Sequence, residues 1–158
     1  MLSKMGRSQY IDIGGVLATG RELVVDDEVD VPSFGSYAFP SPARLDVRIR
    51  RVDRGLDVKG TIDVDYEGSC DRCLEDVRRP LHLLVDERFP AVADATDPLA
   101  EANVLHHDGL DVADLARQLI DAALPMTLVC ESTCPGLCQS CGTRHATGRS
   151  DCPPLDER

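Results

Sequence analysis

Seven cysteines, five of them within residues 130–152, constrain this 158-residue chain more than any other feature. Two CxxC pairs stand at Cys70/Cys73 and at Cys138/Cys141. Two intervening residues let one tight turn bring both sulfurs to a metal ion at about 2.3 Å, while N–H groups of the turn point at the thiolates. The spacing therefore predicts zinc sites built from CxxC turns.

The remaining cysteines allow more than one division of ligands. Tetrahedral zinc takes four nitrogen or sulfur ligands, and the seven cysteines together with His145 make eight. The favoured division forms two sites, one from Cys70, Cys73, Cys130 and Cys134 and the other from Cys138, Cys141, His145 and Cys152. A rival division joins the two CxxC pairs in one ribbon-like site and leaves Cys130, Cys134 and Cys152 as free thiols. One or two Zn²⁺ ions are therefore expected.

Other roles for the cysteines are less favoured. Free cysteines that act as small buried hydrophobic residues rarely cluster so densely. A redox dithiol of the thioredoxin type lies at a helix N-terminus in a βαβ unit, whereas Cys70 stands between two predicted strands and Cys138 in a loop with Gly and Pro. A catalytic zinc needs an open coordination position, which a closed thiolate site does not offer. A structural metal is the favoured interpretation.

Composition and charge limit the cellular setting. No apolar run approaches the roughly 20 residues that span a bilayer, and the N-terminal segment MLSKMGRSQYIDIGG lacks the apolar stretch of a signal peptide. We expect a cytoplasmic protein without membrane association, where thiols stay reduced. Lys and Arg total 17 against 28 Asp and Glu, a net charge of −11, which disfavours a nonspecific nucleic-acid binder.

Alternating apolar and polar residues between positions 44 and 89 predict antiparallel strands with one buried face. Matching the apolar faces places Ile49 opposite Val58 and Arg50 across from Asp57. The turn falls at residues 53–55, where Gly55 is expected to take a positive φ at a bulge. A third strand is expected from residue 81 to residue 89, so the first CxxC lies near a connection between strands.

One helix is expected over residues 110–125, with Asp111 as its N-cap, apolar residues at helical spacing and Pro125 at its end. We predict a single domain of residues 1–158. Its parts are N-terminal strands and a loop (1–44), antiparallel strands with the first CxxC (45–89), the helix (110–125) and a cysteine-rich metal-binding segment (130–152). The predicted fold class is α+β, an antiparallel sheet or partly closed barrel with one main helix and a C-terminal segment held by zinc.

An arginine cluster on the predicted hairpin could contact RNA phosphates: Arg48, Arg50, Arg51 and Arg54. Because acidic residues face these arginines in the predicted pairing, a solvated, ion-paired face is the alternative. The chain has neither a GxSxG nucleophile motif nor a glycine-rich phosphate-binding loop, so we expect no enzymatic activity and no small-molecule substrate.

Three motifs in order carry a resemblance: Cys70-Asp71-Arg72-Cys73-Leu74 after a hairpin, a short helix ending in Leu124-Pro125, and Cys134-Pro135-Gly136-Leu137-Cys138 followed by Cys141-Gly142. Together they resemble the YceD family, the large ribosomal RNA subunit accumulation proteins, over roughly residues 44–152. The resemblance implies a factor needed for large-subunit ribosomal RNA to accumulate, hence for ribosome assembly, with no catalytic residues to carry over. Members of the family resemble one another in having a further cysteine where this chain has Ser150. Because that ligand is missing here, His145 is a candidate to replace it.

The acidity of the chain favours a particular kind of partner. A negative surface steers a cationic protein and shields it from premature contact with RNA. We therefore expect a basic ribosomal protein or a pre-large-subunit particle as partner. The alternative is an RNA-contacting zinc protein that meets ribosomal RNA locally through its arginine hairpin or its cysteine turns.

Overall fold

The computed structural model describes residues 10–53, 55–90, 109–138 and 141–142. Its elements, in chain order, are β1 (Tyr10–Asp12), α1 (Gly14–Thr19), β2 (Leu23–Val29), β3 (Ala43–Val52), β4 (Gly55–Ser69), β5 (Asp76–Pro90), β6 (Gly109–Asp111) and α2 (Val112–Ala123). None of the described helices has the length and apolarity that a bilayer span requires.

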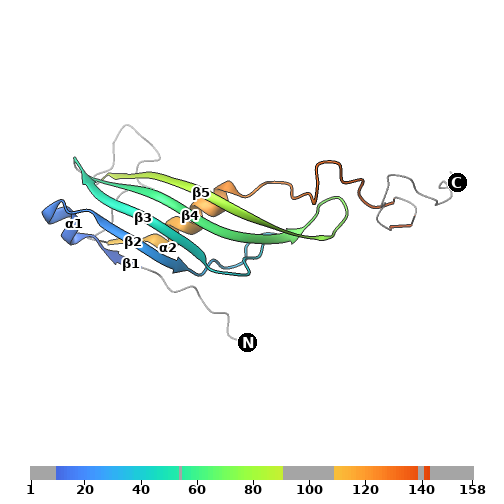
Figure 1. Ribbon diagram of the computed structural model, residues 1–158, viewed down its shortest axis with the longest axis horizontal. Coiled ribbons are helices and arrows are strands. Elements are labelled where there is room, and N and C mark those ends of the chain that lie inside the picture. Colours follow the sequence, from blue (N-terminus) through green and yellow to red (C-terminus); the bar gives the residue numbers. More distant parts are fainter. Residues whose placement is uncertain (1–9, 54, 91–108, 139–140, 143–158) are drawn as a thin grey trace, which may run out of the picture.

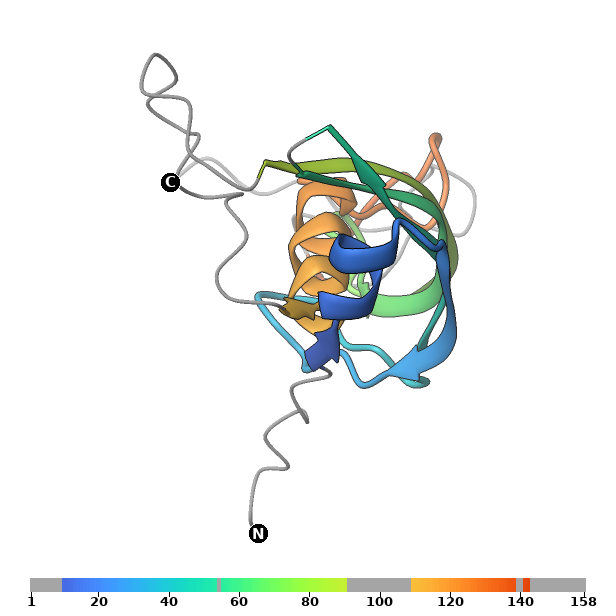
Figure 2. The same ribbon diagram turned by 90° about the vertical axis from the view of Figure 1, so that its left-hand side faces the viewer.

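The main sheet is antiparallel, with strand order β2-β3-β4-β5, and β1 pairs with β6 in a separate two-stranded sheet. The four-stranded sheet curves around α2, and its strands stay open rather than closing into a barrel (Figures 1 and 2). Of the two predicted architectures, the antiparallel sheet is the one observed.

The predicted pairing of β3 with β4 is confirmed. Ile49 lies opposite Val58, and Arg50 lies opposite Asp57. Gly60 faces Val47, where a Cβ atom on the glycine would come within 2.0 Å of the Asp46 carbonyl oxygen. Matching apolar faces fixes this register, because a slip of one residue would turn every apolar side chain to solvent.

The core lies between the concave face of the sheet and α2. The inward side chains Leu45, Val47 and Ile49 of β3 are at most 1% exposed, as are Val112 and Ile120 of α2. Asp111 caps α2 as expected, because its carboxylate accepts hydrogen bonds from the N–H groups of residues 113 and 114. The capping carboxylate and the apolar stripe together fix where this helix begins.

Several local expectations are corrected. Gly55 does not take a positive φ: it is the first residue of β4, paired with Val52, and Asp53 adopts the left-handed conformation with φ 49°. The third strand of the hairpin region begins at Asp76 rather than at residue 81, so β4 and β5 form a ladder that runs to the first CxxC. The short helix α1 and the short strand β6 were not expected, because their apolar residues are too few to show a periodicity.

Candidate metal centre

The first CxxC forms the turn between β4 and β5. The Leu74 N–H donates to the Cys70 carbonyl at 2.8 Å, and the Cys70 N–H donates to the Glu75 carbonyl, also at 2.8 Å. These bonds hold Leu74 in the left-handed region with φ 61°, which is uncommon for a residue other than glycine. The turn continues directly from a ladder of paired strands, so the backbone of both cysteines is fixed by the sheet.

A segment that follows α2 lies beside this turn (Figure 1). Asp71 of the turn forms two hydrogen bonds with Leu128 of the segment. The Asp71 N–H donates to the Leu128 carbonyl at 2.8 Å, and the Asp71 carboxylate accepts from the Leu128 N–H at 2.7 Å. Arg79 of β5 donates to the Cys130 carbonyl at 2.6 Å. The Arg72 guanidinium donates to the Cys134 carbonyl at 3.2 Å. The central residues of the CxxC and one strand arginine therefore position the cysteines of the segment.

Four sulfur atoms meet at this junction, from Cys70, Cys73, Cys130 and Cys134, all within 4.8 Å of one another. The sulfurs of Cys73 and Cys130 are 3.7 Å apart, and those of Cys70 and Cys134 are 3.9 Å apart. Zn–S bonds of about 2.3 Å in a tetrahedron give sulfur separations of about 3.8 Å, whereas a disulfide bond is about 2.05 Å long. The separations fit a four-thiolate metal centre.

The environment of the cluster favours thiolates unequally. Burial opposes ionisation of Cys70, but backbone N–H groups of Cys130, Arg72 and Cys73 donate to its sulfur and lower the pKa to about 6. Hydrogen bonding with the Cys134 sulfur, reinforced by burial, raises the pKa of Cys130 to about 12. In the absence of a cation the Cys70 thiolate is stabilised, while the raised pKa values of Cys73 and Cys130 favour their protonated forms. A divalent ion held by Cys70, Cys73, Cys130 and Cys134 would remove this conflict, because a coordinating thiol loses its proton.

Burial and coordination make the cluster a closed site. Cys70, Cys73 and Cys134 are 0%, 4% and 3% exposed. The Cys130 N–H lies 3.3 Å from the Cys70 sulfur, as expected for a backbone donor to a ligating thiolate. Four sulfurs complete a tetrahedron, so a zinc ion held here would have no open position for substrate or water. The donor set fits structural zinc.

The second CxxC lies outside this cluster. Among the described residues, the four-sulfur group includes neither Cys138 nor Cys141, so the ribbon-like grouping is not formed. Cys138 is buried and Cys141 is exposed. The Gly142 N–H donates to the Cys138 carbonyl at 2.8 Å, and Gly142 has φ 70°. His145 and Cys152 lie outside the described residues, and the second predicted site stays a prediction.

The arginine cluster is engaged with the protein itself. Arg48 lies 3.9 Å from Glu22, and Arg50 lies 3.8 Å from Asp57. Arg51 donates to the Leu17 carbonyl at 2.7 Å, and Arg54 lies outside the described residues. Such exposed pairs contribute little to stability, about 0–1 kcal/mol each. They do offset the positive charge that an RNA-binding hairpin would need.

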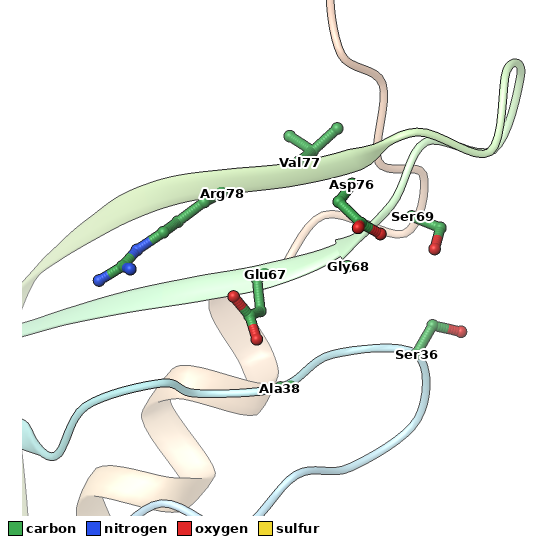
Figure 3. Close-up of a pocket in the computed structure, with 8 residues that line it drawn as sticks. All are labelled: Ser36, Ala38, Glu67, Gly68, Ser69, Asp76, Val77 and Arg78. Carbon is green, nitrogen blue, oxygen red and sulfur yellow. The ribbon is translucent and has the colours of Figure 1, made fainter.

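A pocket of about 340 Å³ lies at the end of the β4–β5 ladder that leads into the first CxxC (Figure 3). The residues that line it include Glu67 and Ser69 of β4, Asp76 and Arg78 of β5, and Ser36 of the loop between β2 and β3. Arg78 lies opposite Glu67 in the ladder but forms its ion pair with Asp65, at 2.8 Å. Among the described residues, neither Glu67 nor Asp76 forms an ion pair, so the pocket keeps two uncompensated carboxylates.

Sequence reasoning missed the residues that assemble the cluster. Asp71 and Arg72 were visible as the two central residues of the first CxxC, and their charge was the available signal. Arg79 could not be recognised, since only the packing of residues 126–134 against β5 gives it a partner.

Comparison with known proteins places these features in a family. The sequence model of the "Large ribosomal RNA subunit accumulation protein YceD" family matches residues 58–157, which include all seven cysteines. Uncharacterized proteins of Mycobacterium tuberculosis and Mycobacterium bovis are each 37% identical over 106 residues, which are 65% of this chain and 51% of theirs. An uncharacterized protein of Mycobacterium leprae is 33% identical over 106 residues, 65% of this chain and 49% of its own. No solved structure matches significantly. The chain spans about half the length of these relatives, and it belongs to the YceD family.

Proposed function

We propose that this chain is a non-enzymatic factor for the accumulation of large-subunit ribosomal RNA, acting in ribosome assembly, with structural zinc at its four-cysteine cluster. The observation that carries the proposal is the family match over residues 58–157, a stretch that contains most of the β4–β5 ladder and the whole cluster.

Zinc has a mechanical role in this proposal. Cys70, Cys73, Cys130 and Cys134 would hold the ion, and a closed thiolate site supplies folding free energy rather than catalysis. Structural zinc contributes about 10–16 kcal/mol of apparent binding free energy at neutral pH. Since two ligands come from the β4–β5 turn and two from the segment after α2, that energy fastens the segment to the sheet.

A basic ribosomal protein, alone or within a pre-large-subunit particle, is the proposed partner. The net charge is −11, and the described arginines of the hairpin are engaged with carboxylates or a carbonyl. The pocket at the end of the β4–β5 ladder adds two carboxylates, Glu67 and Asp76, that a lysine or arginine side chain could neutralise. Complementary charge of this kind accelerates association and makes it sensitive to salt.

The role in RNA accumulation is tested by removing the gene from its host. We expect the ratio of large-subunit to small-subunit ribosomal RNA to fall and to recover on complementation with the wild-type chain. Complementation with Cys73→Ser should fail, whereas Arg48→Glu should restore the ratio, because Arg48 serves neither the cluster nor the pocket. An unchanged RNA ratio in the deletion strain would refute the proposed function.

The partner is tested with the zinc-loaded protein and purified ribosomal components. We expect binding to a basic large-subunit protein that weakens about tenfold or more between 50 and 200 mM salt. The double variant Glu67→Gln/Asp76→Asn should weaken it further, and Arg48→Glu/Arg50→Glu should not. Tight binding to ribosomal RNA alone, lost in the arginine variant, would instead support the RNA-contacting alternative.

A further inference from the structure

Among the residues that the structure describes, the outer edge of β5 has no partner strand. In the described part of the chain β5 pairs only with β4, and it ends the four-stranded sheet (Figure 1). An edge of 15 residues exposes rows of backbone N–H and C=O groups that can template pairing with another strand. Proteins usually obstruct such edges, so the places where β5 is unobstructed are informative.

The position of Pro80 shows which backbone groups face outward. Pro80 lies opposite Asp65 and has no N–H to give to β4, so this must be a pair without hydrogen bonds. Opposite residues alternate between the two kinds of pair. His82, Leu84 and Asp86 therefore direct their backbone groups away from β4, and no described backbone group bonds to theirs.

Two prolines bound this unobstructed stretch. Pro90, like Pro80, lies at a position whose backbone groups point away from β4, so each proline removes one outward N–H. Between them Leu84 stands at the centre with its side chain 80% exposed, the most exposed leucine of the described residues. His82 and Asp86 flank it at equal distances along the strand, which makes the stretch complementary to itself when two copies run antiparallel.

We propose that two copies of this chain associate by pairing β5 with β5 of the second copy, about a two-fold axis at Leu84. This pairing sets Leu84 against Leu84 of the second copy and His82 against Asp86 of the second copy, twice by symmetry. Three pairs of residues with outward backbone groups form about six hydrogen bonds. The two sheets join into one, and the inference does not depend on the proposed function.

The side chains that face each other across the joined edges are complementary in charge. Within one copy His82 contacts Asp63 and Asp86 pairs with Lys59 at 3.0 Å. In the joined sheet each His82 lies between Asp63 of its own copy and Asp86 of the other. Centring the pairing on residue 83 would set Arg78 against Arg88, and centring it on residue 82 would set Pro80 against Leu84. Centring it on residue 85 would separate the two leucines and set His82 against Arg88, so the side chains favour the register centred on Leu84.

The size of the contact sets the expected affinity. The surface area buried by one pair of strands is at or below the low end of the range for specific interfaces, about 1,000 Å². The dimer should therefore be weak, with a dissociation constant of about 10–100 µM, and should exchange rapidly with the monomer.

Sedimentation velocity of the zinc-loaded, reduced full chain from 1 to 500 µM tests the proposal. We expect a monomer that converts to a dimer with rising concentration. Leu84→Pro removes one outward N–H and leaves the hydrogen bonds between β5 and β4 in place. Leu84→Asp sets two carboxylates against each other across the two-fold axis. Each should weaken dimerisation more than tenfold. Val24→Asp, on the opposite edge strand where Val24 is 55% exposed, is the matched control and should leave the dimer unchanged.

Residue-resolved hydrogen exchange provides a second measurement that does not depend on variants. The amides of His82, Leu84 and Asp86 should exchange rapidly in dilute protein and slow at least tenfold at high concentration. Amides of residues 83 and 85, which face β4, should be protected at both concentrations. A monomer at 500 µM, a dimer that resists both Leu84 variants, or one that Val24→Asp disrupts would overturn the proposal.

Discussion

The two CxxC pairs share a closing backbone hydrogen bond but have different surroundings. In each, the residue after the second cysteine donates its N–H to the carbonyl of the first at 2.8 Å, and takes a positive φ, 61° at Leu74 and 70° at Gly142. The first turn presents its thiols to two further cysteines inside an apolar cluster, whereas the second has one buried and one exposed cysteine outside that group.

This difference shows that the first CxxC turn supplies half of the four-sulfur cluster and that the packing of another segment supplies the rest. The first turn extends a ladder in which β4 and β5 have 15 residues each, so its position is fixed before the second pair of ligands arrives. The contacts of Asp71 with Leu128 and of Arg79 with Cys130 then bring that pair into place.

The largest effect should come from removing one ligand of the first turn. Cys73→Ser should release zinc from the cluster and lower the free energy of unfolding by more than about 5 kcal/mol, because structural zinc contributes about 10–16 kcal/mol. Chemical denaturation and native mass spectrometry, each with and without a chelator, measure both quantities.

The matched variant in the second turn is Cys141→Ser. Because Cys141 lies outside the four-sulfur group, we expect zinc to stay bound at the first cluster and the free energy of unfolding to fall by much less than in Cys73→Ser. Equal losses in the two variants would show that the turns form one cooperative site.

Zinc affinity of the first centre should increase steeply with pH. At pH 7 Cys70, with its pKa near 6, is already ionised, whereas Cys73 and Cys130 have raised pKa values and hold protons. Zinc must displace at least these two protons, so the association constant should rise about 100-fold per pH unit from 7 to 8. Below pH 6 Cys70 also gains a proton, and the dependence becomes steeper.

Chelator competition at several pH values measures this slope. The double variant Cys138→Ser/Cys141→Ser is the appropriate protein, since it confines zinc to the first centre. A slope of less than one proton per zinc ion would mean that the thiols of the cluster are already ionised in the metal-free protein.

Much of the fold could be predicted because its signals are local. The register of β3 and β4 follows from the alternation of apolar residues, and the beginning of α2 follows from the capping carboxylate of Asp111. The first residues of β5 could not be recognised, because Asp76, Arg78 and Arg79 interrupt the alternation. Their strand conformation is imposed by pairing with β4, which is a tertiary effect.

The grouping of Cys70 and Cys73 with Cys130 and Cys134 was favoured in sequence because it left no thiol unused, a counting argument without geometry. What sequence spacing could not supply is the reason for the grouping. Cysteines 57 or more positions apart meet because Asp71 forms two hydrogen bonds with Leu128 and Arg79 forms one with Cys130, and none of these bonds is visible without the packed structure.

Asp71→Ala tests the link that distinguishes the first turn. The substitution leaves the partly buried Leu128 N–H without its carboxylate acceptor, which should lower the free energy of unfolding by about 1–2 kcal/mol and weaken zinc binding by up to tenfold. Arg48→Ala, on the exposed outer face of β3, is the control and should change stability by less than about 0.5 kcal/mol. An Asp71→Ala protein with unaltered zinc affinity would assign the assembly of the cluster to the cysteines alone.

The smallest effect concerns the one residue at which the two turns differ in conformational strain. Leu74 has φ 61° and a side chain exposed to solvent, so Leu74→Gly removes the left-handed strain without sacrificing burial. The greater freedom of glycine in the unfolded chain offsets part of the gain, which leaves an expected stabilisation of about 0.5–1 kcal/mol in thermal or chemical unfolding. Leu74→Ala keeps the strained conformation and should give no such gain. If Leu74→Gly instead destabilises the protein, the leucine side chain must contribute contacts that outweigh its backbone strain, and the first turn would then depend on more than its cysteines and its hydrogen bonds.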